Sequence, residues 1–338
     1  MKCVLPRRRE GTGKCYGEIV LNLRASGSPW FIYELKMATI DPKIAPNQKD
    51  LHDLLLGAVA PRPIALASTV DRDGNVNLSP FSFFNIFSTR PPVLVFSPSR
   101  RQRDNTTKHT LENLLETREV VINTVSYSMV EQVSLASSEF PKGVNEFVKA
   151  GLTEIKSEKV KPPRVKESPV SFECSVLEVK PLGFEGGAGN LAICEVILIH
   201  AQDFILNDKG KVDPWKIDNV ARMGENYYCR ASGESIFEVA KPSLPVGIGI
   251  DLLPSEIRNS CVLTGNNLGR LANVDKMPTA EEVKDFAKQF NYKFIVSVNG
   301  EDRLISIHKQ AQRFLADGEV KNAWLLLLSS IYQPEPWS

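Results

Sequence analysis

The segment from Asn77 to Asn85 combines residue types that suit a site for a flat, amphipathic ring. It holds three phenylalanines among two serines, two asparagines and a proline. Aromatic rings offer stacking area, while hydroxyl, amide and backbone groups offer hydrogen bonds to the edge of a ring. By itself, the segment fits equally well a half-buried strand whose start is broken by Pro80.

A polar, basic loop follows between a predicted strand, 93–97, and a predicted helix, 109–117. Residues 97–108 contain three arginines, a lysine and several hydroxyl groups. Backbone N–H groups at a helix N-terminus, together with Thr106, Thr107, Lys108 and Arg100, suit a phosphate. A solvated basic turn is the plainer interpretation of the loop alone. A ring site and a phosphate site together describe a mononucleotide, and the aromatic content favours a flavin.

A third cluster places Gly224 between Arg222 and the paired tyrosines Tyr227 and Tyr228. It could form a tight loop with a flat aromatic wall, or a turn that only closes a barrel. The segment 187–192 has the letters of a dinucleotide fingerprint, but strand-like residues follow it where a helix is required. We therefore predict a hairpin loop there.

Other kinds of chemistry lack a signature. The chain has no P-loop and no Gly-x-Ser-x-Gly elbow. Its four histidines are scattered, so we predict no metal site and expect these residues at the surface or at helix ends. The six cysteines include no C-x-x-C pair, which argues against a zinc ribbon and favours a reducing, cytoplasmic location. We interpret Cys174 as a small core residue.

Composition limits the partners. The net charge is +1, so no global charge attracts nucleic acid or a membrane surface. No stretch approaches the ~20 apolar residues of a membrane span. The first 36 residues carry seven basic groups against three acids. We interpret them as a disordered extension or as an artefact of an upstream start codon.

The remaining pattern predicts a mainly β domain followed by helices. Strands 64–70 and 76–84 flank a turn at Gly74, and further strands are expected at 120–125, 170–179 and 191–200. Short strands with few helices suggest an antiparallel barrel. A capping box at 279–282 and apolar residues at helical spacing predict three helices in the tail, packed on the barrel or on each other.

The three clusters together resemble the flavin reductase-like family of FMN-binding split barrels. The resemblance lies in segments 62–69, 77–85, 96–98, 190–196 and 221–228, and it covers about residues 55–235. Segments 257–260 and 263–271 resemble the tail of a longer subgroup. The resemblance implies an antiparallel six-stranded FMN-binding split barrel with flanking helices and an α-helical C-terminal extension.

The resemblance also implies a domain order and a set of cofactor contacts. The domains are an extension, 1–36, an FMN-binding domain, 37–235, and a mostly helical extension, 236–338. Residues 79–85 would line the isoalloxazine ring, Ser68 and Thr69 would lie near the ring or ribityl chain, and the basic loop would hold the phosphate. The expected FMN-binding residues are Arg62, Ser68, Thr69, Ser79, Phe81, Ser82, Phe83, Asn85, Ser97, Ser99, Arg100, Lys108, Arg222, Gly224 and Tyr227.

The activity that this family implies is hydride transfer from NAD(P)H to flavin, in a homodimer with one FMN per subunit. Electrons would pass on to free flavin, oxygen, ferric iron or a partner oxygenase. Because the cofactor carries the chemistry, no catalytic residue is expected to stand out in the sequence. The alternatives are a non-catalytic FMN carrier or sensor and a related split-barrel enzyme that oxidises its own small substrate on FMN. The sequence leaves the electron acceptor and the choice between NADH and NADPH open.

Overall fold

The structure, a computed structural model, describes residues 39–43, 48–242, 246–289 and 300–332. The chain divides into two compact units, with the break between Glu238 and Val239. Residues 1–36 lie outside the described residues. The division into an extension, 1–36, an FMN-binding domain, 37–235, and a helical extension, 236–338, stays a prediction.

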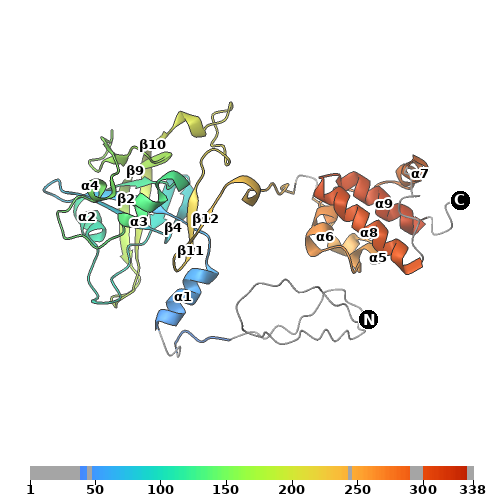
Figure 1. The fold of residues 1–338 in the computed structure, drawn as a ribbon, viewed down its shortest axis with the longest axis horizontal. Helices are drawn as coiled ribbons and strands as arrows, with labels where there is room; N and C mark the ends of the chain where they lie inside the picture. Colours follow the sequence, from blue (N-terminus) through green and yellow to red (C-terminus); the bar gives the residue numbers. More distant parts are fainter. Residues whose placement is uncertain (1–38, 44–47, 243–245, 290–299, 333–338) are drawn as a thin grey trace, which may run out of the picture. The chain divides into compact units, whose positions relative to one another are not determined.

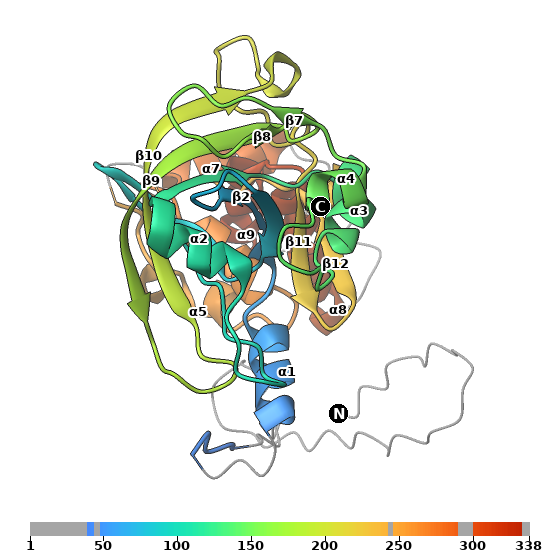
Figure 2. The ribbon, with the colours of Figure 1, turned by 90° about the vertical axis from the view of Figure 1, so that its left-hand side faces the viewer.

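A seven-stranded antiparallel sheet dominates the first unit (Figure 1), and the family resemblance implied a barrel of six strands. Figure 2 shows its two longest strands as strongly curved ribbons. The order across the sheet is β3 (Val76–Phe81), β2 (Ala65–Val70), β6 (Glu119–Asn123), β9 (Val170–Pro181), β10 (Asn190–Ala201), β5 (Pro92–Phe96) and β4 (Phe84–Thr89).

Strand β2 is buried along its whole length because both of its faces are covered. Ala65 and Ala67 pack with Phe96 and with Leu114 of helix α2 (His109–Thr117). Residues on the other face pack with helices α3 (Val130–Leu135) and α4 (Glu146–Ala150). Small side chains on the first face leave space for α2 to approach, so β2 positions the start of that helix.

The strand predicted at 76–84 ends earlier than expected. β3 stops at Phe81, the chain bends at Ser82 and Phe83, and β4 begins at Phe84. The reason is a long-range pairing, because the Phe83 carbonyl accepts a hydrogen bond from the Ser97 N–H at 2.9 Å and Phe84 pairs with Phe96. By contrast, the predicted turn between β2 and β3 is confirmed, with Gly74 at φ +87°.

The segment between β6 and β9 carries short elements that the sequence pattern did not predict. Besides α4, it forms a two-stranded sheet of β7 (Glu154–Ile155) and β8 (Arg164–Val165). A third sheet joins β1 (Arg62–Pro63), β11 (Val220–Gly224) and β12 (Tyr227–Arg230). Helix α1 (Gln48–Ala58) precedes β1.

The second unit is helical, as predicted. Its elements are α5 (Ser255–Arg258), α6 (Gly265–Ala272), α7 (Ala280–Gln289), α8 (Gly300–Ala316) and α9 (Val320–Tyr332). The expected capping box is present, with Thr279 and Glu282 exchanging hydrogen bonds. The three predicted tail helices share one core with α5 and α6, centred on Trp324 and Leu271.

His308 is an exception to the expected surface histidines. It is 3% exposed, and its Nδ1 lies 2.6 Å from the Ser260 hydroxyl. The interpretation of Cys174 as a core residue is confirmed, since it is fully buried and burial raises the pKa of its thiol. Within the part of the chain that the structure describes, no helix is both long and apolar enough to cross a membrane.

Candidate functional site

Lys108 connects the basic loop to the aromatic segment. It stands immediately before helix α2, and its ammonium group lies 5.1 Å from the centroid of the Phe81 ring. The Phe81 ring in turn packs against Phe96 of β5, with centroids 5.3 Å apart. A cation over an aromatic face is an attractive arrangement. The two clusters that the sequence suggested are therefore neighbours in space.

Ser97 makes a second connection between the same two clusters. Its N–H bonds to Phe83, as described above, and its side chain is buried against Gly189. A Cβ at position 189 would lie 2.6 Å from Ser97 Oγ, so this approach requires glycine. The Ser97 hydroxyl has no hydrogen-bond partner among the described residues. It is a buried polar group whose partner could be a ligand.

The third cluster is connected to the aromatic segment through Arg62. Arg62 and Arg222 are directly opposite each other across β1 and β11. The Arg62 side chain is 6% exposed, donates to the carbonyl oxygens of Leu56 and Val59, and lies 3.5 Å from the Ser82 hydroxyl. Burial and the nearby Arg222 lower its pKa. Arg62 therefore anchors helix α1 while its guanidinium borders the Ser82 bend.

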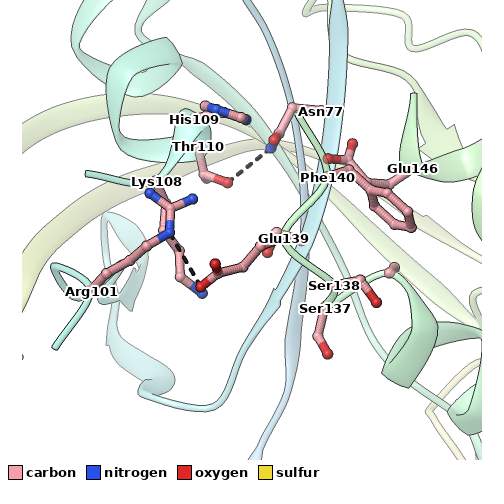
Figure 3. Close-up of a pocket in the computed structure, with 12 residues that line it drawn as sticks. Asn77, Arg101, Lys108, His109, Thr110, Ser137, Ser138, Glu139, Phe140 and Glu146 are labelled. Atoms are coloured by element: carbon pink, nitrogen blue, oxygen red, sulfur yellow. Dashed lines mark hydrogen bonds and ion pairs between the residues drawn. The ribbon is translucent and has the colours of Figure 1, made fainter. Parts of the chain in front are cut away.

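A cavity opens beside Lys108, at the start of helix α2 (Figure 3). Residues of the aromatic segment, the basic loop, α2 and the connection from α3 to α4 surround it. They are Asn77, Ser79, Arg101, Lys108, His109, Thr110, Ala136, Ser137, Ser138, Glu139, Phe140 and Glu146. The cavity measures about 30 Å³, which is room for about two water molecules.

The helix start at this cavity is well anchored. The Asn77 amide donates to the Thr110 hydroxyl at 2.9 Å, and Asn113 donates to Thr69 at 3.1 Å. No side chain caps the N-terminus of α2. Helix N-termini attract anions because their first N–H groups lack intrahelical partners. The helix thus directs partial positive charge toward the cavity.

The Lys108 ammonium is the distinctive charge in the cavity wall. No hydrogen bond or ion pair within 4 Å joins it to any residue that the structure describes. Burial, and secondarily Arg101, lower its pKa, while Glu139 opposes this shift. Lys108 is partly buried. A partly buried cation without a hydrogen-bonded partner is costly, and a bound anion would reduce that cost. The site suits a phosphate group.

Arg100 and Arg101 of the basic loop make different contacts. Arg101 faces the cavity, donates to Thr106 and Thr107, and pairs with Glu139 at 3.4 Å. Arg100 instead folds back on its own loop and donates to Asn105 at 2.6 Å. Of these two, only Arg101 lines the cavity. The role of Arg100 as a phosphate ligand stays a prediction.

The remaining expected residues lie at varied depths. Ser68 and Thr69 are fully buried in β2, and Thr69 accepts hydrogen bonds from two asparagines. Ser79 lines the cavity. Asn85 accepts a hydrogen bond from the next N–H in β4, and Ser99 is partly buried in the loop. Gly224 has φ +125° at the β11–β12 turn, and Tyr227 is 69% exposed.

Several cavity residues were not predicted from the sequence. Ser137, Ser138, Glu139, Phe140 and Glu146 reach the site from the connection after α3 and from the start of α4. Glu146 is buried, accepts a hydrogen bond from the Leu78 N–H at 2.9 Å, and has a pKa raised by burial. A buried glutamate at the start of a short helix leaves no periodic signal, so only the fold reveals it.

Comparison with known proteins identifies the family of the first unit. A family model described as "Flavin reductase like domain" matches residues 57–215. An uncharacterised protein of Aquifex aeolicus is 43% identical over 189 residues, which cover 56% of this chain and 94% of that protein. The YwrF protein of Bacillus subtilis is 30% identical over 205 residues, which cover 58% of this chain and 96% of that protein.

Two solved structures share the fold. Nitrilotriacetate monooxygenase component B from Bacillus cereus has a TM-score of 0.56 and 30% identity, covering 60% of this chain and 98% of that one. The 2-nitrobenzoate 2-nitroreductase NbaA from Pseudomonas fluorescens has a TM-score of 0.55 and 23% identity, covering 63% of this chain and 100% of that one. The helical unit after Val239 lies beyond the residues of the family match. Residues 57–215 form a split barrel, and the chain belongs to the flavin reductase-like family.

Proposed function

We propose that this protein binds FMN and uses it to move electrons from NAD(P)H to a second acceptor. The observation that carries the proposal is the unpaired ammonium of Lys108, held over Phe81 at an uncapped helix N-terminus. Its chemistry fits the phosphate end of a mononucleotide. The bend at Ser82 and Phe83, between Ser97 and Arg62, fits the ring end.

In this proposal the protein binds and orients, and the cofactor reacts. Lys108 and Arg101 hold the phosphate group, and hydroxyl groups such as that of Ser79 complete its contacts. Arg62 stabilises negative charge at the ring edge because burial strengthens electrostatic interactions. Bound FMN would supply a ring that accepts hydride and later releases the electrons.

The acceptor in the proposal is free flavin, oxygen, ferric iron or a partner oxygenase. The printed name of the Bacillus cereus relative describes it as a monooxygenase component, which supports the last of these. A non-catalytic FMN carrier or sensor would need the same binding residues, so the cofactor site alone does not distinguish the two functions.

The proposal includes a homodimer. Strand β4 is the last strand at one edge of the seven-stranded sheet. Its side chains Ile86 and Phe87 are 58% and 69% exposed. Neighbouring large apolar side chains on an open sheet edge are characteristic of a surface that another chain covers.

A spectroscopic titration tests the proposed function. The purified protein, incubated with FMN and desalted, is expected to show the visible absorption of a bound flavin. Anaerobic addition of NADH or NADPH is expected to bleach it. A protein that retains no FMN at micromolar concentrations would contradict every flavin function. Bound FMN that neither nucleotide bleaches would instead support the carrier.

A further inference from the structure

Glu139 lines the same cavity as Lys108 and extends toward the basic loop. Its two carboxylate oxygens face different arginines. Oε1 lies 3.4 Å from Arg101 Nε, and Oε2 lies 3.1 Å from Arg103 Nη2. Figure 3 shows the carboxylate directed at Arg101 across the cavity. The segment after α3 is thereby joined to the basic loop by charge.

The position of Glu139 matters because of the charges around it. Arg101 and Lys108 are the cations of the cavity wall, and Glu139 is close enough to Lys108 to favour its charged form. The other carboxylate in the wall, Glu146, is bonded to the backbone of β3. Glu139 is therefore the carboxylate whose charge is directed at the cations that suit a phosphate.

The ion pairs of Glu139 differ in burial. The Glu139 side chain is 53% exposed, while those of Arg103 and Arg101 are 73% and 19% exposed. The exposed pair with Arg103 contributes about 0–1 kcal/mol, so it holds Glu139 in place only weakly. Since Arg101 already pairs with Glu139 at 3.4 Å, a phosphate group that binds Arg101 must compete with this carboxylate.

We propose that Glu139 is an electrostatic gate, an internal anion that competes with the phosphate group of the ligand for Arg101 and Lys108. When the ligand binds, Glu139 swings toward solvent and Arg101 becomes a second phosphate ligand. When the ligand leaves, Glu139 takes back Arg101. The gate lowers affinity for phosphate monoesters and favours exchange of the cofactor over permanent retention. Only the identity of that monoester as FMN depends on the proposed function.

The substitution Glu139→Gln tests the gate in the full-length protein, with Glu131→Gln as the matched control. Glu131 is exposed on α3 and does not line the cavity. Both variants lose one negative charge, but only Glu139→Gln removes the competitor. We expect Glu139→Gln to bind FMN about tenfold more tightly, because a like charge at a partly exposed site has a moderate effect. Riboflavin, which lacks the phosphate, should bind all three proteins equally.

A second titration separates this inference from the proposed function. Inorganic phosphate is added to the three proteins and the midpoint of thermal unfolding is followed. The gate predicts a larger stabilisation of Glu139→Gln than of the other two proteins at equal phosphate concentration. If FMN binds none of the proteins but phosphate shows this difference, the result supports the gate and contradicts the proposed flavin function. If FMN and phosphate affinities are unchanged or weaker in Glu139→Gln, the gate is overturned.

Discussion

The Lys108 ammonium lies 5.1 Å from the centre of the Phe81 ring. Twenty-seven positions separate these residues in sequence, and their contact brings a cationic group to the end of an aromatic strand. The same strand continues into the bend at Ser82, where Arg62 approaches from the other side. One short stretch of backbone thus lies between the Lys108 ammonium and the Arg62 guanidinium.

Replacing Lys108 with methionine is expected to weaken FMN binding by about 1.5–3 kcal/mol, the usual contribution of a charge-assisted hydrogen bond. The apolar stem over Phe81 is kept, so stability should change little. Quenching of flavin fluorescence measures the affinity, and riboflavin should lose much less. Lys166→Met, at an exposed position outside the cavity, is the control. Equal losses for FMN and riboflavin would contradict a phosphate role for Lys108.

Arg100→Ala is expected to weaken FMN binding less than Lys108→Met. Its guanidinium is already bonded to Asn105, within the same loop. The substitution should loosen that loop, which limited proteolysis would detect as faster cleavage between residues 100 and 105. A loss of affinity larger than that of Lys108→Met would place the phosphate at Arg100 and away from the cavity.

Phe87→Lys is expected to disrupt the proposed homodimer. A charge in the centre of a buried apolar contact is costly unless it is paired. Light scattering coupled to size-exclusion chromatography should give a dimer for the parent protein and a monomer for the variant. Val148→Lys, at a position on α4 that is 76% exposed, should leave the dimer intact. A monomeric parent protein would contradict the homodimer directly.

The helical unit is expected to lose stability in mild acid because of His308. Burial lowers the pKa of His308 to about 4, from an ordinary value of 6.5. Between these values the unfolded chain binds a proton that the folded chain does not, so the free energy of unfolding falls as the pH falls. The slope should approach about 1.4 kcal/mol per pH unit. Urea unfolding followed by helical circular dichroism at pH 7 and pH 5 measures it.

His308→Gln provides the comparison for this pH dependence. Glutamine can still accept a hydrogen bond from Ser260, but it does not titrate. The variant should show a smaller loss of stability between pH 7 and pH 5. An equally large loss in the variant would assign the acid sensitivity to other groups.

Much of the fold could be predicted from local sequence patterns. The turn at Gly74, helix α2 and the Thr279–Glu282 capping box each have a signal within a few residues, because their hydrogen bonds are local. The early end of β3 at Phe81 has no such signal. It depends on the bond between Phe83 and Ser97, and a long-range bond of this kind is visible only once the sheet has formed.

The candidate site shows the same limit. Lys108 and Ser79 stood out because basic and aromatic clusters are compositional signals. Glu139 and Glu146 did not, because a charged residue in a polar segment is usually a solvated one. Their contacts arise from the packing of α3 and α4 against β3. The sequence therefore indicated Lys108, named Arg100 where Arg101 lines the cavity, and missed the two carboxylates.

The bond from the Leu78 N–H to Glu146 has a consequence for assembly. β3 and β4 are the two outer strands of the seven-stranded sheet. On β3, the buried Glu146 carboxylate occupies a main-chain donor that a foreign strand would need. β4, with Ile86 and Phe87 exposed, is the more accessible outer strand. A unit with one exposed edge strand can pair with only one other copy, so any self-association through that edge would stop at a closed dimer. Two exposed edge strands would instead permit an open-ended fibre.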